Sequence, residues 1–200
     1  LQANAAGSMA ISETDALTIA GMTAAGDVAL HAGGDLSIES LTTTAGNVTL
    51  GSGGAVSIAT LDAGSGSLSI TSNGSISDQA GSFINAGATF LDAGTQDITL
   101  GDDALEEVNF GSLDVRGGNV SISEDSAMNI ERLVATSATM RAAGGVNLAD
   151  ANVADLAVHA DGDITDSGAV VAADASLQAS GDVVLDHAAN DFGRVEASAG

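Results

Sequence analysis

The sequence predicts an all-β fold, a right-handed parallel β-helix (solenoid) with coils of about 20 residues and three short strands per coil. Gly26, Gly46 and Gly66 are evenly spaced, and each is followed by a polar residue and an apolar-x-apolar triplet. A second glycine and a second apolar triplet follow within each unit. A fixed period with internal alternation is typical of solenoids, whose units must stack to bury their apolar faces. Right-handed winding is the default for parallel strands.

Taken in order, residues 1–25 form one weaker coil and residues 26–85 hold three regular coils. The next coil is expected to begin at Ala86, with Ala88 and Phe90 facing inward. Its second strand should carry two further inward residues, Ile98 and Leu100. The first strands of later coils are expected to begin at Gly118, Thr136, Ala154 and Ala173.

An acidic insertion at residues 101–107 enlarges the coil that begins at Ala86, and its third strand resumes over residues 110–115. The interval from Ala86 to Gly118 is far longer than that between any other two successive starts, and the insertion is taken to explain the difference. Nine coils at a strand spacing of about 4.8 Å predict a rod about 45 Å long. Residues 1–200 are expected to form a single repeat segment of a longer protein.

A second, longer repeat overlies the coils. The passage that starts at Ile76-Ser77-Asp78 and reaches Phe110-Gly111 resembles the one that starts at Ile164-Thr165-Asp166 and reaches Phe192-Gly193. Asp78 and Asp166 stand where other coils have Ile or Leu. We expect both strands to leave the sheet early at a corner, because a lone buried carboxylate is costly.

Composition excludes several classes of function. The chain has 27 acidic residues, four arginines and a net charge of −23, so it lacks the basic surface that nucleic acid or an anionic membrane requires. It has no apolar run long enough for a membrane span. It has no cysteine, which excludes disulfides, thiolate metal sites and a cysteine nucleophile.

The chain resembles the β-helical shaft of filamentous-haemagglutinin-type exoproteins, the large adhesins of bacterial two-partner secretion. The resemblance rests on the G-x-[VL]-x-[LI] coils, the G-[DS]-[IL]-[ST]-[ID] second strands and the passage from Leu185 to Gly193, and it covers nearly the whole chain. It implies export, display at the bacterial cell surface and an elongated scaffold. It transfers no functional residue, because the family's secretion domain has no counterpart here.

Stacked acidic residues are the main candidates for a ligand site. Asp155 should lie over Asp174 and Asp163 over Asp182, with two more acids, Asp161 and Asp166, at adjoining corners. Neighbouring carboxylates repel, and bound Ca²⁺ is one way to offset this; solvated acids on an acidic rod are the alternative. The insertion carries a second such group, which consists of Asp102, Asp103, Glu106 and Glu107.

Other side chains give no pattern of catalysis. His31 and His159 share a coil position but lie several coils apart, and His187 is separate, so no metal site or catalytic centre is expected. Small polar residues occupy one outward position in eight coils: Thr18, Ser37, Ser57, Ser77, Thr99, Asn129, Asn147 and Thr165. This file is interpreted either as a flat glycan- or ice-binding face or as a solvated strand face.

These observations predict a structural shaft of a secreted or surface-exposed bacterial adhesin or filament, with no enzymatic activity and no cofactor other than a possible Ca²⁺. Its expected partners are neighbouring β-helical coils, further copies of itself end-to-end, and a host or cell-surface glycan or protein. No nucleic acid and no membrane insertion are expected. The alternative is a carbohydrate-binding or polysaccharide-degrading β-helix.

Overall fold

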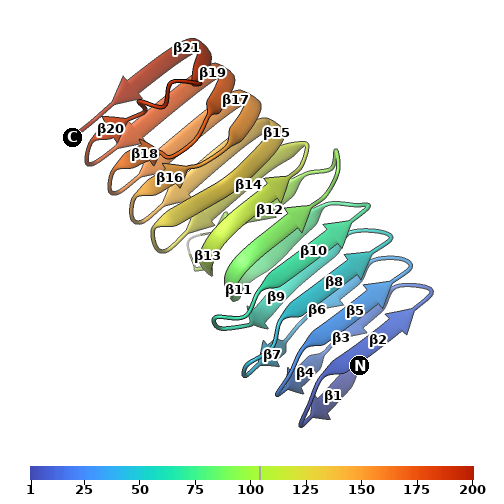
Figure 1. Cartoon of the computed structure of the whole chain (residues 1–200). Coiled ribbons are helices and arrows are strands. Elements are labelled where there is room, and N and C mark those ends of the chain that lie inside the picture. Colours follow the sequence, from blue (N-terminus) through green and yellow to red (C-terminus); the bar gives the residue numbers. More distant parts are fainter. Residues whose placement is uncertain (104) are drawn as a thin grey trace.

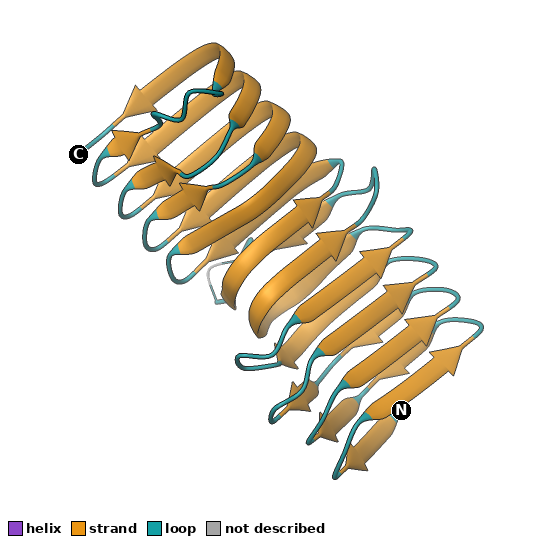
Figure 2. Ribbon diagram, in the orientation of Figure 1, coloured by secondary structure: helices purple, strands orange, loops and turns teal. Residues whose placement is uncertain are grey.

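The computed structural model describes residues 1–103 and 105–200, and Figure 2 shows strands joined by loops throughout this part of the chain. Among these residues, none forms a helix of the length and apolarity that a membrane crossing requires. The first strands are β1 (Gln2–Ala5), β2 (Met9–Glu13), β3 (Leu17–Ile19), β4 (Gly21–Ala24), β5 (Val28–Ala32), β6 (Leu36–Ile38), β7 (Leu41–Thr43), β8 (Val48–Ser52), β9 (Val56–Asp62) and β10 (Leu68–Ser72). The remaining strands are β11 (Ile76–Asp92), β12 (Ile98–Leu100), β13 (Glu107–Arg116), β14 (Asn119–Glu124), β15 (Met128–Ala142), β16 (Val146–Leu148), β17 (Ala151–Ala160), β18 (Ile164–Asp166), β19 (Val170–Ala179), β20 (Val183–Val184) and β21 (Asp191–Ser198).

All of these strands pair in parallel and wind into a right-handed shaft with its termini at opposite ends (Figure 1), which confirms the predicted fold class. Pairing between coils defines three sides. Side A begins with β2, β5, β8 and β10, side B with β3, β6 and the start of β9, and side C with β1, β4, β7 and the end of β9. Longer strands such as β11 bend round the corners and contribute to all three sides.

Side B gives the true period of the coils. One continuous ladder joins Leu17, Leu36, Val56, Ile76, Ile98, Val120, Ala138, Leu156, Ala175 and Val195. The shaft therefore has about 10 turns, with coils of roughly 19 residues. The single enlarged coil expected from Ala86 to Gly118 does not exist, because Ile76, Ile98 and Val120 are evenly spaced members of this ladder.

The strands predicted to begin the later coils lie on a different side of the shaft from those that begin the early coils. The strands after Gly118, Thr136, Ala154 and Ala173 lie on side B, whereas those after Gly26, Gly46 and Gly66 lie on side A. The cause is β13, which was expected to be one strand on one side. It places Val108 and Phe110 on side C and, after the corner at Gly111, Leu113 and Val115 on side A. The insertion therefore explains only part of the spacing, and its Ala104 lies outside the described residues.

The inward register is confirmed in the regular coils and wrong by one residue at the start of the fifth. Val28, Leu30 and Val56 are buried, as expected. Ala88 is exposed and Phe90 half-buried, whereas Thr89 and Leu91 face the interior and pair with Leu68 and Ile70. Of the four phenylalanines only Phe110 is buried, so the core consists mainly of Val, Ile, Leu, Ala and Met, as a narrow interior requires.

Polar residues at the corners bind the backbone of the next coil. Asp27 Oδ1 accepts a 2.8 Å hydrogen bond from the N–H of Asn47, and Asn47 Oδ1 accepts one of 2.9 Å from the N–H of Ser67. Asp35 and Asp97 do the same for Ala55 and Asn119. Backbone donors at the corners are thus satisfied where the ladder is interrupted, which gives many of the acidic residues a structural role.

Close packing of the corners also explains the repeated glycines. A Cβ atom at Gly46 would lie 2.1 Å from the carbonyl oxygen of Gly26, and one at Gly66 would lie 2.1 Å from that of Gly46. A side chain at either position would clash with the previous coil, so the regular spacing of these glycines records direct contact between coils.

Candidate functional site

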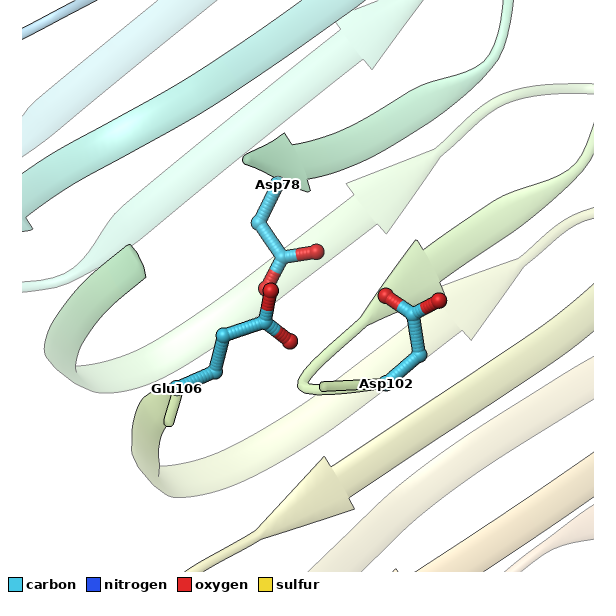
Figure 3. Close-up of side chains that lie close together, drawn as sticks. All are labelled: Asp78, Asp102 and Glu106. Carbon is cyan, nitrogen blue, oxygen red and sulfur yellow. The ribbon is translucent and has the colours of Figure 1, made fainter. Parts of the chain in front are cut away.

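Three carboxylates converge at the corner between sides B and C. Asp78 lies at the end of the side B segment of β11, and Asp102 and Glu106 come from the loop between β12 and β13 (Figure 3). One ligand oxygen from each lies within 4.8 Å of the other two. Among residues 1–103 and 105–200, this is the only group of three acidic or histidine side chains that are this close.

The cluster is partly buried and short of hydrogen-bond donors. Asp78 Oδ2 accepts 2.8 Å hydrogen bonds from the N–H of Gly101 and the hydroxyl of Ser82, but its Oδ1 is buried and has no partner among the described residues. Glu106 is 8% exposed, and its Oε2 accepts a 2.7 Å bond from the N–H of Asp103. Burial raises the pKa of both Asp78 and Glu106, and nearby carboxylates raise both further.

The expected early exit of the strands at Asp78 and Asp166 does not occur, because Asp78 still pairs with Ile58 and Asp166 with Leu148 in the ladder, and both side chains are half-buried. Asp166 accepts hydrogen bonds from the N–H groups of Asp186 at 3.1 Å and His187 at 3.2 Å, and from the side-chain amide of Asn190. Both aspartates therefore anchor the loop of the following coil, and neither is a lone buried carboxylate.

The predicted stacks of acids exist, but they do not form a second group of three. Asp155 pairs with Asp174 across neighbouring coils, and Arg194 Nη1 lies 4.0 Å from Asp174 Oδ1. Asp163 Oδ1 accepts a 2.8 Å hydrogen bond from the N–H of Asp182. The repulsion expected between stacked carboxylates is thus offset by an arginine in one pair and by a backbone donor in the other. Two further acids, Asp161 and Asp166, have separate partners.

Within the insertion, sequence reasoning named four acids and the structure brings two of them to the cluster. Asp103 and Glu107 are exposed and lie outside the group of three. The third member, Asp78, comes from the previous coil and was not linked to the insertion, because the two segments are more than one coil apart in sequence.

The histidines are dispersed, as expected, although His31 and His159 do not share a side of the shaft. His31 lies on side A beside Gly51, and His159 lies on side B beside Gln178. His187 lies in the loop before β21, where its Nδ1 accepts a hydrogen bond from the N–H of Ala189.

The outward polar file is real on side B, but its membership differs from the prediction. It runs through Thr18, Ser37, Ser57, Ser77, Thr99, Ser121 and Thr139. Asn129, Asn147 and Thr165, which were assigned to the same file, form a separate ladder outside side B. There Asn147 donates to Asn129 Oδ1 at 2.9 Å, the kind of side-chain ladder that a solvated strand face allows.

One buried acid was missed by sequence reasoning. Glu124 ends β14 with 4% of its surface exposed; its Oε2 accepts a 3.4 Å hydrogen bond from the N–H of Phe110, and its Oε1 has no partner among the described residues. Burial raises the pKa of Glu124 to about 8. The sequence could have indicated this burial, because every second residue of a strand faces inward and Glu124 follows Val120 and Ile122 in that alternation.

Comparison with known proteins adds a family. The model of a family described as repeats of unknown function (DUF5649) matches residues 45–105 and 135–198, which together exceed half of the chain. The chain belongs to this family. No curated protein and no solved structure gives a significant match.

The two DUF5649 segments are rotated against each other by one side of the shaft. Ala88 to Phe90 of the first segment lie on side A, whereas Ala175 to Leu177, their counterparts in the longer repeat, lie on side B. Equivalent positions of the longer repeat therefore face different directions, although each segment folds into the same kind of coil.

Proposed function

We propose that this chain is part of the structural shaft of a secreted or surface-displayed bacterial adhesin or filament, a rigid spacer for attachment or extracellular fibre assembly. The observation that carries the proposal is the unbroken core: buried residues run from Leu17 to Leu177. The resemblance to filamentous-haemagglutinin-type shafts and the membership of a repeat family are consistent with it.

Hydrogen bonding between coils supports a mechanical role. Val28 N–H donates to Asn47 O at 2.8 Å, and Val48 N–H donates to Ser67 O at 2.8 Å, so each coil is bonded to the next. Such bonds run along the shaft on three sides, and a pulling or bending force is shared among them. Nearest-neighbour contacts of this kind suit a long element whose stability grows with the number of coils.

The surface charge supports separate shafts in solution. With a net charge of −23, the side walls of two copies repel each other at low ionic strength. Lateral aggregation is thereby opposed, while contacts along the shaft axis remain available.

Surface display can be tested on intact cells of the source bacterium. Antibodies raised against residues 1–200 should label extended structures outside the cell in immunogold electron microscopy, and external protease should remove the label. A cytoplasmic protein serves as the control for cell integrity. Labelling that occurs only after permeabilisation would contradict the proposal.

A carbohydrate-binding or polysaccharide-degrading role is the second candidate, favoured by one depression on side B. It is lined by the acids Asp155 and Asp174, the hydroxyls of Thr139 and Ser176, and Arg194. Hydroxyls, carboxylates and an arginine on a sheet face are groups that bind sugars. A glycan array with the unaltered chain and Arg194→Ala tests this role, with Asp15→Asn as a distant acidic control. Saturable binding that Arg194→Ala abolishes would favour the second candidate over a pure shaft.

A further inference from the structure

The strongest unassigned feature is the corner where the loop of residues 101–107 meets the preceding coil. Figure 3 shows the carboxylates of Asp78, Asp102 and Glu106 turned toward one another, the first from the side B segment of β11 and the other two from the loop. The hydrogen bond from Gly101 N–H to Asp78 Oδ2 ties the start of the loop to that coil. The three carboxylates that meet beside this bond carry the same charge when they are ionised.

One oxygen of the cluster points to a missing positive partner. Asp78 Oδ1 is buried without a donor from the described residues. Glu106 is more than nine-tenths buried, and its one hydrogen bond within the described structure goes to Oε2. An unpaired buried carboxylate oxygen costs free energy that a native fold normally offsets with a donor, a proton or a cation.

The second DUF5649 segment provides an internal comparison. Its equivalent aspartate, Asp166, meets two backbone N–H groups and the side-chain amide of Asn190, which are all donors. Asp78 also has two donors, Gly101 N–H and the Ser82 hydroxyl, but the longer loop adds Asp102 and Glu106, which are acceptors. The same anchor therefore meets donors in one segment and two further carboxylates in the other.

We propose that Asp78, Asp102 and Glu106 bind one Ca²⁺ ion, which fastens the 101–107 loop to the preceding coil. Ca²⁺ prefers carboxylate oxygens, accepts irregular geometry and tolerates water among its ligands. Asp102 is exposed, so the open side of the site can complete the coordination with water. Mg²⁺ demands a near-ideal octahedron and gives up its water reluctantly, so it fits this corner less well.

Binding must compete with protons. Ca²⁺ binds the ionised form of a carboxylate, so protons and Ca²⁺ compete for the same oxygens and binding is measured at mildly alkaline pH.

The experiment is calorimetric titration of CaCl₂ into the chelator-treated chain of residues 1–200 at mildly alkaline pH, with thermal unfolding followed by circular dichroism. We expect one saturable site, a rise in melting temperature with CaCl₂, and a smaller rise with MgCl₂. Glu106→Gln and Asp78→Asn should each weaken binding at least tenfold. Asp155→Asn is the matched control, because it removes one charge from an exposed acid outside the cluster and should leave the affinity unchanged.

Glu106→Gln keeps the proposal testable if Asp78→Asn unfolds, since the glutamine can still accept the bond from Asp103 N–H. No saturable heat at millimolar Ca²⁺ would overturn the proposal. So would binding that Glu106→Gln leaves unchanged. A third outcome would also overturn the proposal: Ca²⁺ does not bind, the unaltered chain becomes more stable as the pH falls, and Glu106→Gln does not show this gain. A proton shared by the carboxylates would then neutralise the corner instead.

Discussion

The carboxylate of Glu124 is held inside the shaft against the backbone of Phe110, the only buried phenylalanine among the described residues. This contact joins β14 to β13, the strand at which the chain passes from side C to side A. A titratable group therefore lies inside the part of the shaft that sets the order of all later coils.

Glu124 makes stability depend on pH. Because its pKa in the folded chain is raised to about 8, folding takes up a proton between the pKa of the unfolded chain and pH 8. The contribution of this group to stability should be greatest below about pH 4.5 and fall as the pH rises to 8, by on the order of 4 kcal/mol. Urea unfolding of the unaltered chain and Glu124→Gln at pH 5, 7 and 9 measures this. We expect the variant to be the more stable of the two at pH 9. If the free energy of unfolding changed with pH equally in both chains, the raised pKa of Glu124 would be refuted.

Replacing Val56 by Asp should be severe. Val56 is fully buried between Leu36 and Ile76 on side B, where an aspartate would have no partner. We expect a loss of at least about 4 kcal/mol in the free energy of unfolding. The control is Thr49→Asp, an exposed position on β8, which should change the free energy by about 0.5 kcal/mol or less. Similar melting of both variants would mean that the inward register is wrong.

Replacing Gly46 by Ala should also destabilise the shaft, for a steric reason. The new Cβ would lie 2.1 Å from Gly26 O, which is backbone and can move only if two coils separate. We expect a loss of about 3 kcal/mol. Gly7→Ala is the matched control, because a Cβ there meets nothing within 4 Å, and it should be neutral or slightly stabilising.

Substituting His31, His159 and His187 together should leave folding largely intact. His31 and His159 are exposed side chains on two different sides, and in the described structure only the ring of His187 accepts a backbone hydrogen bond. The loss should not exceed about 1 kcal/mol, the value of that bond. Thermal unfolding of the triple variant measures it. Any turnover on pectin or hyaluronan that vanished in this variant would instead assign these residues to a catalytic centre.

The isolated segment should associate along its axis. In the described structure β1 pairs only with β4 and β21 only with β19, so each end of residues 1–200 presents a free strand edge. The acidic side walls repel, and salt screens that repulsion. We expect light scattering and electron microscopy to show oligomers that lengthen end-to-end as NaCl is raised. Stable monomers at high salt and high concentration would contradict this expectation.

Much of the fold follows from the sequence because the pattern repeats. The spacing of Gly26, Gly46 and Gly66 reports direct contact between coils, and the alternation at Val28 and Leu30 reports which side chains face the interior. Both signals are local, and each coil contacts only its neighbours, so they predict the solenoid, its period and the register of the regular coils.

Only the tertiary structure decided which side of the shaft each later strand occupies. All three sides carry the same alternation, so the sequence does not mark a side, and one unrecognised corner at Gly111 shifts every strand after it. For the same reason the sequence did not reveal the cluster of Asp78 with Glu106. These residues become neighbours only because of the lengths of the coil and of the loop that separate them in the sequence. Residues about one coil apart become neighbours here through stacking, and the length of each turn, rather than the residue types, determines which of them meet.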